Sequence, residues 1–479
     1  MKNSKRLGTN AALNVIKQLF TILFPLITFP YASRILGVAN YGKINFSSSI
    51  ISYISLIAGL GVYNYAIREG ARVRESKNKL KKLSNEIFTI NCASTAIAYL
   101  ILGLLLVFNN KLSDYSWLLL IQSSTILFTT LGIDWFNVIH EDYFFITLRY
   151  ILCQGLSLFL MFILVRNQED YLQYAFTSVI SSIIANILNL FYIKKQYQYI
   201  PCITFNKECL IHFKSIMIMF GSAIATLIYI NSDVTILGIL KNDTIVGYYS
   251  VSAKIYTLIK QLLNALLVVA MPRLSSEIAK LDFKMINKHY NQIFSYLVLI
   301  LGPACTGLFM LSDNIILLFS GSEYLPAASS LRILSVSLLF ATIACFYVNV
   351  IMIPNRMEKY VLRATVISAV TNIVLNFILI PFWGQNAAAL TTVIAELLMF
   401  ICGVYYTKKI AQLHFNKNIL ISFICSIGVV ILCIISKMFL LNNTLIIVIS
   451  LGVSILLWVI CIMAFYRKEI MTFIRCKHR

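Results

Sequence analysis

Long apolar stretches, separated by short polar gaps, recur from one end of the chain to the other. A bilayer core of about 30 Å is crossed by roughly 20 apolar residues of helix. The stretches lack the alternation of membrane β-strands, so the helix is the only form that satisfies the backbone in lipid. We predict an all-α polytopic membrane protein of about fourteen transmembrane helices, at 11–32, 44–66, 87–108, 116–139, 143–165, 172–193, 215–240, 247–271, 292–318, 331–353, 361–380, 387–407, 419–440 and 445–466.

Positive charge falls mainly in every second gap between these helices. About 29 of the 40 Lys and Arg residues lie on one side of the predicted membrane, against about 6 on the other. Because the basic side of multi-pass proteins faces the cytoplasm, we expect both termini there and an even number of helices. The basic segments are 2–6, 68–82, 194–214, 273–288, 356–363, 408–417 and 467–479.

The composition agrees with a protein whose solvent is lipid. Mean hydropathy is +0.82, 59% of the residues are hydrophobic and only 12% are charged. The net charge of +21 is spread over loops that the topology explains, so nucleic-acid binding is not expected. The first apolar stretch is too long for a signal peptide and no small-residue cleavage site follows it, so we expect no cleavable signal peptide. Most of the 11 cysteines fall within helices and the 5 histidines lack ligand spacing, so we expect no disulfide, metal or cofactor.

The connections between the helices are short on both sides of the membrane. External connections are no longer than about a dozen residues, which is too few for a folded domain. The cytoplasmic gaps hold no phosphate-binding loop and no dinucleotide-binding glycine motif. We therefore expect a transporter rather than an enzyme, driven by an ion gradient or by the gradient of its own substrate.

A short repeat indicates two related halves. Its copies occupy the same point of two six-helix blocks, as two lobes facing a central cavity would require. We predict a first lobe at 1–193, a cytoplasmic linker at 194–214, a second lobe at 215–407, and two extra helices with a basic tail at 408–479. The copies are Ile35-Leu36-Gly37 with Tyr41-Gly42, and Ile236-Leu237-Gly238 with Val246-Gly247.

Charged residues at membrane depth are the main candidates for function, because each one costs free energy. Asp134 and Arg149 stand about seven residues on either side of a tight cytoplasmic turn, so antiparallel packing brings them to similar depth. They form either a structural ion pair or a pair that gates or couples ions. The same argument places Asp233 beside Lys254, for which a structural pair is the first interpretation.

Three further charged residues have no partner that the spacing reveals. Lys17, in the inner half of the first helix, either reaches toward the lipid headgroups or faces a wet cavity. Lys260 lies near the centre of its helix, where such reaching is difficult, so a cavity role is favoured. Glu396 is also central, and is either a protonatable carboxyl group or a neutral acid hydrogen-bonded between helices.

Several short motifs stand in the first third of the chain: Leu13-Asn14, Ser33-Arg34-Ile35-Leu36-Gly37, Tyr41-Gly42, Gly61, Tyr65-Ala66-Ile67-Arg68-Glu69-Gly70-Ala71 and Gly132-Ile133-Asp134-Trp135. They resemble those of the polysaccharide-export flippases, a group that includes bacterial O-antigen flippases. This group lies within the multidrug/oligosaccharidyl-lipid/polysaccharide exporter superfamily. Length and topology extend the resemblance over the whole chain. One departure is Val138-Ile139-His140, because the family often has a second glycine before the acidic residue that follows.

The resemblance implies a function. Such proteins move an undecaprenyl-diphosphate-linked oligosaccharide from the cytoplasmic to the outer leaflet of the bacterial inner membrane, by alternating access coupled to H⁺ or Na⁺. A polysaccharide polymerase and a chain-length regulator are the expected protein partners. The candidate substrate-binding residues are then Lys17, Arg34, Lys254 and Lys260, and the candidates for ion coupling or gating are Asp134, Arg149, Asp233 and Glu396.

Two alternatives stay open at this point. A multidrug exporter of the same superfamily would share the fold, but its cavity is usually acidic and it usually has twelve helices. A membrane polymerase or ligase of the same glycan pathway would also be polytopic. Those enzymes need a large external loop with catalytic residues, and no gap in this chain has the length for one.

Overall fold

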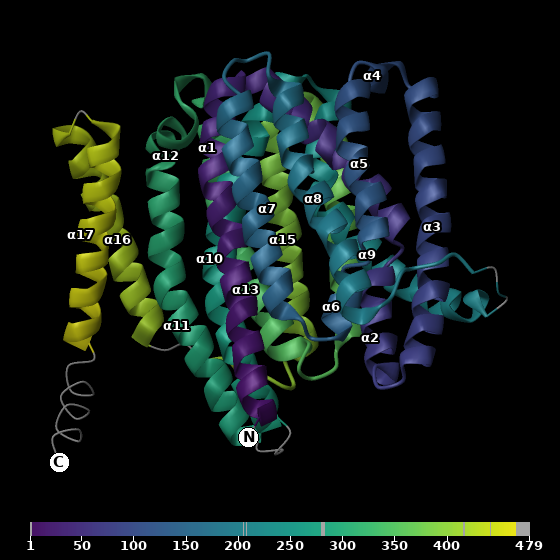
Figure 1. Ribbon diagram of the computed structural model, residues 1–479. Coiled ribbons are helices and arrows are strands. Elements are labelled where there is room, and N and C mark those ends of the chain that lie inside the picture. Colours follow the sequence, from purple (N-terminus) through teal and green to yellow (C-terminus); the bar gives the residue numbers. More distant parts are fainter. Residues whose placement is uncertain are drawn as a thin grey trace. The chain divides into compact units, whose positions relative to one another are not determined.

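The computed structural model describes residues 2–204, 206, 208–278, 283–414, 417–440 and 442–465. The described residues are mostly helical and contain no β-strand (Figure 1). The prediction of an all-α membrane protein is therefore confirmed. The chain divides into two compact units, 1–247 and 248–479.

The first unit contains nine helices and the first turn of a tenth. They are α1 Lys2–Gly59, α2 Val62–Val73, α3 Lys77–Phe108, α4 Asn110–Ser113, α5 Ser116–Gly132, α6 Trp135–Ile139, α7 Tyr143–Leu164, α8 Tyr171–Tyr197 and α9 Cys209–Leu240. The long helix α1 packs against α3, α5, α7 and α9. Helix α8 packs against both α5 and α7, and the short helices α2 and α6 pack against each other.

The second unit contains the rest of α10 and the helices that follow it. They are α10 Asp243–Ile278, α11 Phe283–Met310, α12 Ser312–Ser320, a 3₁₀ turn η1 Ser322–Tyr324, α13 Ala327–Phe346, a π-helical segment η2 Tyr347–Met352, α14 Glu358–Trp383, α15 Gln385–Thr407, α16 Lys417–Phe439 and α17 Asn443–Phe465. Helix α15 packs against α13 and α14. Helix α11 packs against α13 and α16, and α16 packs against α17.

Twelve helical segments in the described residues are long and apolar enough to cross a membrane. The first of them, 13–73, covers both helices predicted at 11–32 and 44–66. The two helices follow one another without a loop, because they are joined by a kink at Gly37. The φ of Gly37 is 69°, a conformation that glycine adopts without strain. Helix α10 covers the predicted helix at 247–271. The predicted number of fourteen is therefore approximate, and the predicted architecture of successive apolar helices is confirmed.

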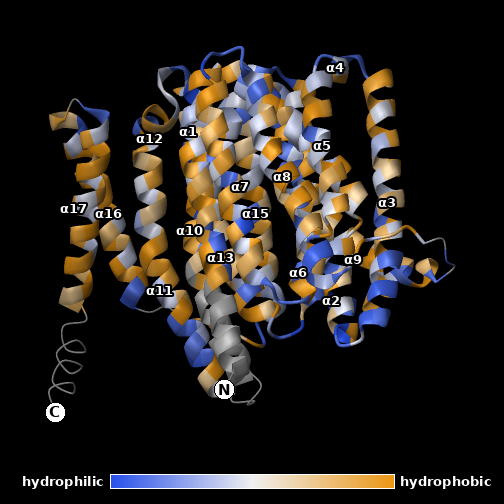
Figure 2. Ribbon diagram, in the orientation of Figure 1, coloured by the Kyte–Doolittle hydropathy of each residue, from blue (hydrophilic) through white to orange (hydrophobic). Residues whose placement is uncertain are grey.

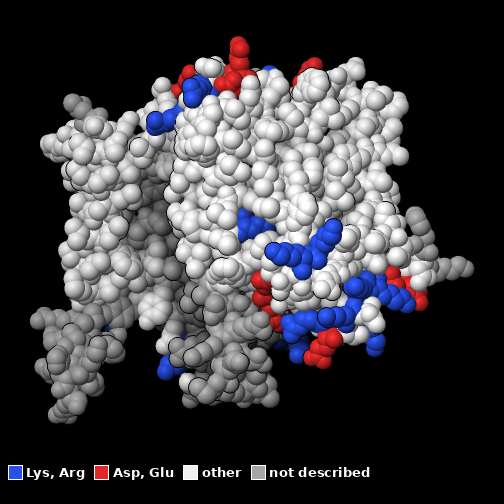
Figure 3. Space-filling view, in the orientation of Figure 1, with Lys and Arg blue, Asp and Glu red and all other residues white. Residues whose placement is uncertain are grey.

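Apolar side chains cover the outward faces of the helices where a water-soluble protein would carry polar ones. Figure 2 shows this on α3, α16 and α17, with hydrophilic residues gathered around α2 and α6. Figure 3 shows Lys and Arg crowded over the same end of the first unit, beneath a largely uncharged belt. Lipid tails replace a protein core as the partner of such a belt.

The turn between α6 and α7 lacks the glycine that the family often has, and its backbone shows why. The residue in the left-handed conformation is Glu141, with φ 58°, and His140 before it has an ordinary φ of −85°. Arg74 on the C-terminal side of α2 holds this turn through Glu141 Oε1 at 2.6 Å and the carbonyl oxygen of Ile139 at 3.3 Å. A glycine at position 140 is therefore not needed in this chain.

The predicted lobe boundary at 194–214 stays a prediction. Helix α9, which follows it, packs against α1, α2 and α3 within the first unit. The basic tail at 467–479 lies outside the described residues, as do residues 205 and 207 of the linker.

Candidate functional site

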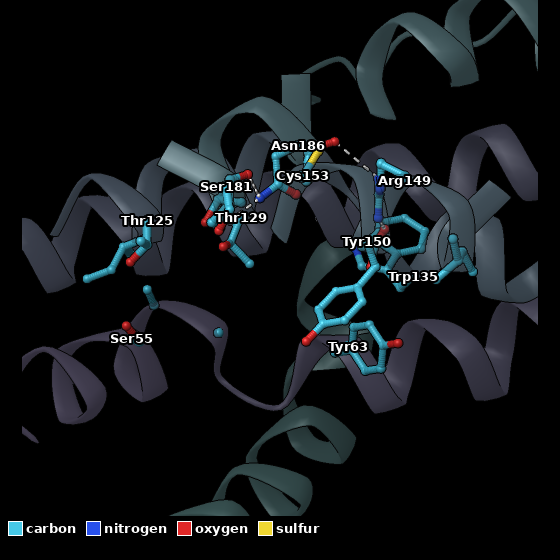
Figure 4. A pocket seen from close by; sticks show the side chains of 18 of the residues that line it. Ser55, Tyr63, Thr125, Thr129, Trp135, Arg149, Tyr150, Cys153, Ser181 and Asn186 are labelled. Atoms are coloured by element: carbon cyan, nitrogen blue, oxygen red, sulfur yellow. Dashed lines mark hydrogen bonds and ion pairs between the residues drawn. The ribbon is translucent and has the colours of Figure 1, made fainter. Parts of the chain in front are cut away.

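A cavity of about 410 Å³, lined by both polar and apolar side chains, lies inside the first unit, among α1, α2, α3, α5, α6, α7 and α8. Figure 4 shows hydroxyl and amide side chains of α5 and α8 along one part of its wall and aromatic rings beside Arg149 at another. The lining residues are Lys17, Ser55, Ala58, Gly59, Tyr63, Asn91, Thr125, Ile126, Thr129, Thr130, Asp134, Trp135, Ile146, Arg149, Tyr150, Cys153, Gln154, Ser181, Ser182, Ala185 and Asn186.

Asp134 and Arg149 form an ion pair at this cavity. Ile133, with φ 41°, ends α5 and places Asp134 just before α6, while Arg149 lies in the second turn of α7. Arg149 Nη2 donates to Asp134 Oδ1, and Nη1 donates to the carbonyl oxygen of Ala185 at 3.3 Å. The predicted pairing is therefore confirmed, whereas a role in gating or ion coupling stays a prediction.

The two members of this pair differ in their exposure. The Arg149 side chain is 7% exposed, and its Nε has no hydrogen-bond partner. The Asp134 side chain is 29% exposed. A buried guanidinium depends on its partners far more than a carboxylate that water can reach. Removing Asp134 should therefore destabilise the protein more than removing Arg149.

Lys17 also lines the cavity. Its Nζ lies 5.8 Å from the centre of the Tyr150 ring, a cation–π arrangement. In the part of the chain that the structure describes, Lys17 has no carboxylate within ion-pair distance. The sequence left two interpretations of Lys17, a side chain that reaches the lipid headgroups or one that faces a cavity. Its position in the cavity wall agrees with the second. The cavity wall then carries two cationic side chains and one carboxylate.

Neutral polar side chains that the sequence reasoning missed complete the wall. Asn91 Nδ2 donates to the carbonyl oxygen of Ala58 at 2.9 Å, and Thr95 and Thr130 share a hydrogen bond of 2.7 Å. Asn186 packs so closely that a Cβ on Gly132 would lie 2.0 Å from its Oδ1. The signal was the helical spacing of polar residues in apolar stretches, at 91, 94 and 95 and at 182, 186 and 189.

The second unit holds a separate buried ion pair between α10 and α15. Lys260 Nζ lies 2.5 Å from Glu396 Oε1, and Tyr256 Oη donates to the same oxygen at 3.3 Å. The Glu396 side chain is 5% exposed and that of Lys260 24%. The sequence reasoning assigned neither residue a partner, because 136 positions separate them and no turn relates them.

The remaining candidates are not brought into the first-unit cavity. Arg34 is exposed on α1, Asp233 is buried on α9, and Lys254 is half-buried on α10. Asp233 belongs to the first unit and Lys254 to the second, so their pairing stays a prediction. The assigned roles of all eight candidate residues stay predictions as well.

A second buried polar group was also missed. Asn376 Nδ2 donates to Asn372 Oδ1 at 3.0 Å on α14, and Thr391 of α15 donates to Asn376 Oδ1 at 2.6 Å. The four-residue spacing of the two asparagines in an apolar helix was the available signal.

Within the described residues, no group of three or more His, Cys, Asp or Glu side chains has the arrangement of a metal site.

Comparisons with known proteins identify the family of the chain. The family model described as polysaccharide biosynthesis protein matches residues 7–278, more than half of the chain. The chain belongs to this family. The model described as lipid II flippase MurJ matches residues 155–461 of the same family member.

One curated relative and two solved structures are similar to the chain. A Shigella dysenteriae protein whose curated name includes the words O-antigen transporter is 23% identical over 79% of this chain and 94% of its own. The structure of lipid II flippase MurJ in an inward closed conformation has a TM-score of 0.77 at 18% identity, over 95% of this chain and 99% of that one. An inward-facing multidrug transporter of the MOP superfamily has a TM-score of 0.58 at 14% identity, over 82% and 97%.

The two solved structures establish the fold at these identities, and the family model establishes the membership. The protein therefore belongs to the polysaccharide biosynthesis family and also matches the model of the lipid II flippases over more than half of its length. These families consist of transporters rather than catalytic enzymes. The expected membership is confirmed.

Proposed function

We propose that the protein translocates an undecaprenyl-diphosphate-linked oligosaccharide, the repeat unit of O-antigen or a similar surface polysaccharide, across the bacterial inner membrane. The family match over residues 7–278 carries the proposal, and a cavity with two cationic side chains and one carboxylate among membrane-spanning helices supports it. A glycan headgroup with its diphosphate cannot cross hydrocarbon unaided, whereas the polyprenyl tail can stay in the bilayer. A polar path between helices removes most of that barrier.

The cavity chemistry suits a charged glycan headgroup. The rings of Tyr63 and Tyr150 can stack on pyranose faces, and their hydroxyls can bond sugar hydroxyls. Lys17 and Arg149 supply positive charge for phosphate oxygens, in the form of one flexible ammonium and one planar guanidinium. A cation-exporting multidrug site would favour the opposite charge, so this wall weighs against that alternative.

Transport by alternating access, with H⁺ or Na⁺ as the coupling ion, is part of the proposal. The carboxylate of Asp134 is the first candidate for ion exchange, because it faces the cavity and its partner Arg149 can hold or release it. Asp233 and Glu396 are the other acidic candidates. Lys254, Lys260 and Arg34 remain candidates for attracting the anionic substrate, with Lys260 acting in balance with Glu396.

The orientation of the protein also belongs to the proposal. The basic segments support a cytoplasmic position for both termini and for the α2–α3 connection, in a bacterium. A polysaccharide polymerase and a chain-length regulator would then receive the glycan on the outer side. The proposed direction of transport is outward, from the leaflet where lipid-linked precursors are made.

The test uses a bacterial strain that lacks its own copy of the gene, with surface polysaccharide as the readout. Lys17→Ala should lower surface polysaccharide strongly, whereas Lys17→Arg should restore much of it because the positive charge returns. Lys437→Ala is the matched control, because Lys437 Nζ bonds the carbonyl oxygen of Met310 at an exposed position. Each variant must reach the membrane in normal amount.

Two results would contradict the proposal. The first is normal surface polysaccharide in cells without the protein when no other flippase is present. The second is a wild-type protein that exports cationic drugs and leaves polysaccharide unchanged. Loss of export in both Lys17 variants, with normal amounts of protein, would instead point to packing rather than charge at this position.

A further inference from the structure

A cluster of titratable side chains joins α9 to α2 and α3, at the end of the helices that the charge pattern assigns to the cytoplasm. His212 lies in the first turn of α9, Glu86 in α3 and Tyr65 in α2. His212 Nε2 lies 2.9 Å from Glu86 Oε2, and His212 Nδ1 lies 2.6 Å from the Tyr65 hydroxyl oxygen. All three residues belong to the first unit, and none of them lines its cavity.

Apolar side chains enclose this cluster. The Glu86 side chain is 7% exposed and that of His212 15%. Tyr65 is buried together with Ile87, the neighbour of Glu86 on α3, and Ile216, one turn after His212 on α9. Within the described residues, Glu86 Oε1 has no hydrogen-bond partner. A carboxylate so poorly solvated is costly unless a positive charge or a bound proton neutralises it.

The geometry of the cluster accepts a proton without breaking a contact. With a neutral imidazole, Nε2–H can donate to the Glu86 carboxylate while the Tyr65 hydroxyl donates to Nδ1. With one more proton, His212 donates from both ring nitrogens, and the Tyr65 oxygen accepts instead. The contact with Glu86 then becomes an ion pair, which is stronger than the hydrogen bond of a neutral imidazole. Imidazole is also the side chain whose charge ordinarily changes between about pH 5 and about pH 8.

The other charged groups around the cluster are paired with one another. Lys82 of α3 pairs with Glu208, which precedes α9, and this contact holds the pKa of the Glu208 carboxyl below its usual value. On α2, Glu69 Oε1 accepts from Arg68 Nε at 2.9 Å, and Glu69 Oε2 accepts from Arg72 Nη1 at 2.9 Å. These opposite charges balance each other beside the site. The imidazole and the buried carboxylate are therefore left to respond to a proton.

The chain that precedes α9 is fastened to the same stretch of α3, beside which it passes in Figure 1. Tyr199 Oη donates to Asn85 Oδ1 at 2.8 Å, and the backbone nitrogen of Cys202 donates to the same oxygen at 3.2 Å. The backbone nitrogen of Thr204 donates to Thr89 Oγ1 at 2.9 Å. The titratable cluster follows these neutral hydrogen bonds at the point where the chain becomes α9. A change in its contacts therefore acts directly on the start of that helix.

We propose that Tyr65, Glu86 and His212 bind a proton from the cytoplasm, and that this proton fastens α9 to α2 and α3 during the transport cycle. The inference rests on the proposed function, in which H⁺ is a candidate coupling ion. The bound proton sits on His212 opposite the Glu86 carboxylate, and its loss leaves a weaker hydrogen bond between them. Because the site is separate from the cavity, it responds to pH without touching the glycan.

Proton binding is measured without transport, by NMR of protein labelled with ¹⁵N at its 5 histidines. The signal of His212 is the one that His212→Gln removes. We expect it to change from neutral to charged imidazole between about pH 9 and about pH 5, with a midpoint that falls by about one pH unit, a tenfold loss of proton affinity, in Glu86→Gln. His414→Gln and Glu358→Gln are the matched controls, because both side chains are exposed, and should leave the midpoint unchanged.

Tyr65→Phe is a second variant, in case Glu86→Gln fails to fold. It should also lower the midpoint, because the Nδ1–H of the charged imidazole loses its acceptor. Two results would overturn the proton site: a His212 signal that does not titrate in this range, or a midpoint that neither variant moves.

The part that the proton plays in transport has its own readout, the rate of glycan translocation in proteoliposomes at about pH 6 and about pH 8. The wild-type rates should differ between the two, and the difference should shrink in His212→Gln and persist in His414→Gln. An equal pH dependence in His212→Gln and wild type would overturn the role in the cycle. If His212 titrates as expected but even the wild-type protein moves no glycan, the proton site stands and the proposed substrate fails.

Discussion

The Asp134–Arg149 pair supplies the most quantitative prediction, because its members are unequally buried. Asp134→Asn removes the charge that faces a guanidinium only 7% exposed, whose Nε already has no partner. Breaking a buried ion pair in this way costs about 3–5 kcal/mol. Arg149→Gln leaves a carboxylate that is 29% exposed and can be hydrated, so we expect a smaller loss, of about 1–3 kcal/mol.

The double variant Asp134→Asn with Arg149→Gln should be less destabilised than the sum of the two single variants by about 2 kcal/mol or more, since no charge is left alone. The assay is thermal unfolding of the purified protein in detergent, followed by the loss of its monodisperse chromatography peak. The nearby pair Arg74–Glu141 is the matched control, with side chains 42% and 49% exposed. Its own double-mutant cycle should give about 0–1 kcal/mol.

Two results would refute this reasoning. Additive losses in the Asp134 and Arg149 variants would mean that the two side chains do not interact. A larger loss for Arg149→Gln than for Asp134→Asn would mean that the exposure difference does not govern the cost. The charge swap, Asp134→Arg with Arg149→Asp, separates the roles: it should restore part of the transport if the pair is structural, and none if Asp134 exchanges ions.

Three further predictions concern other parts of the chain. In a cysteine-free background, an impermeant thiol reagent applied outside should label Asn110→Cys and not Ser76→Cys, and the reverse pattern would overturn the proposed orientation. Glu396→Gln should destabilise the second unit by about 3 kcal/mol or more, because Lys260 would lose its partner; an unchanged melting temperature would refute the pairing. Gly132→Ala should cost about 1–3 kcal/mol, because its Cβ would meet an asparagine of α8, and normal stability in thermal unfolding would contradict that packing.

The fold followed from the sequence wherever a local rule applied. Apolar length identified the membrane helices, and the turn at Glu141 brought Asp134 and Arg149 to one depth because the residues between them form a short hairpin. Both inferences concern residues that are close together in the chain, within one helix or across one turn between two helices. The sequence predicted a gap between the helices at 11–32 and 44–66, because a polar stretch with a glycine is typical of a loop, whereas the structure joins the two helices through a kink at Gly37.

Contacts between distant segments could not be predicted in the same way. The pair Lys260–Glu396 joins α10 to α15, and helical periodicity says nothing about which distant helices become neighbours. The polar walls of α5 and α8 were visible as spaced Ser, Thr and Asn residues, but their convergence on one cavity needed the fold. The repeat indicated related halves, whereas the contact between Gly42 and Gly247 appears only in three dimensions.

The central claim, that the protein moves a lipid-linked glycan across a bilayer, has a direct test in proteoliposomes. Purified protein is reconstituted with an undecaprenyl-diphosphate-linked oligosaccharide, and a glycosidase added outside cleaves the glycans it can reach. The account predicts that the fraction cleaved rises from that of the outer leaflet toward the whole population. A cleaved fraction equal to that of protein-free liposomes, under imposed H⁺ and Na⁺ gradients of either direction, would contradict it.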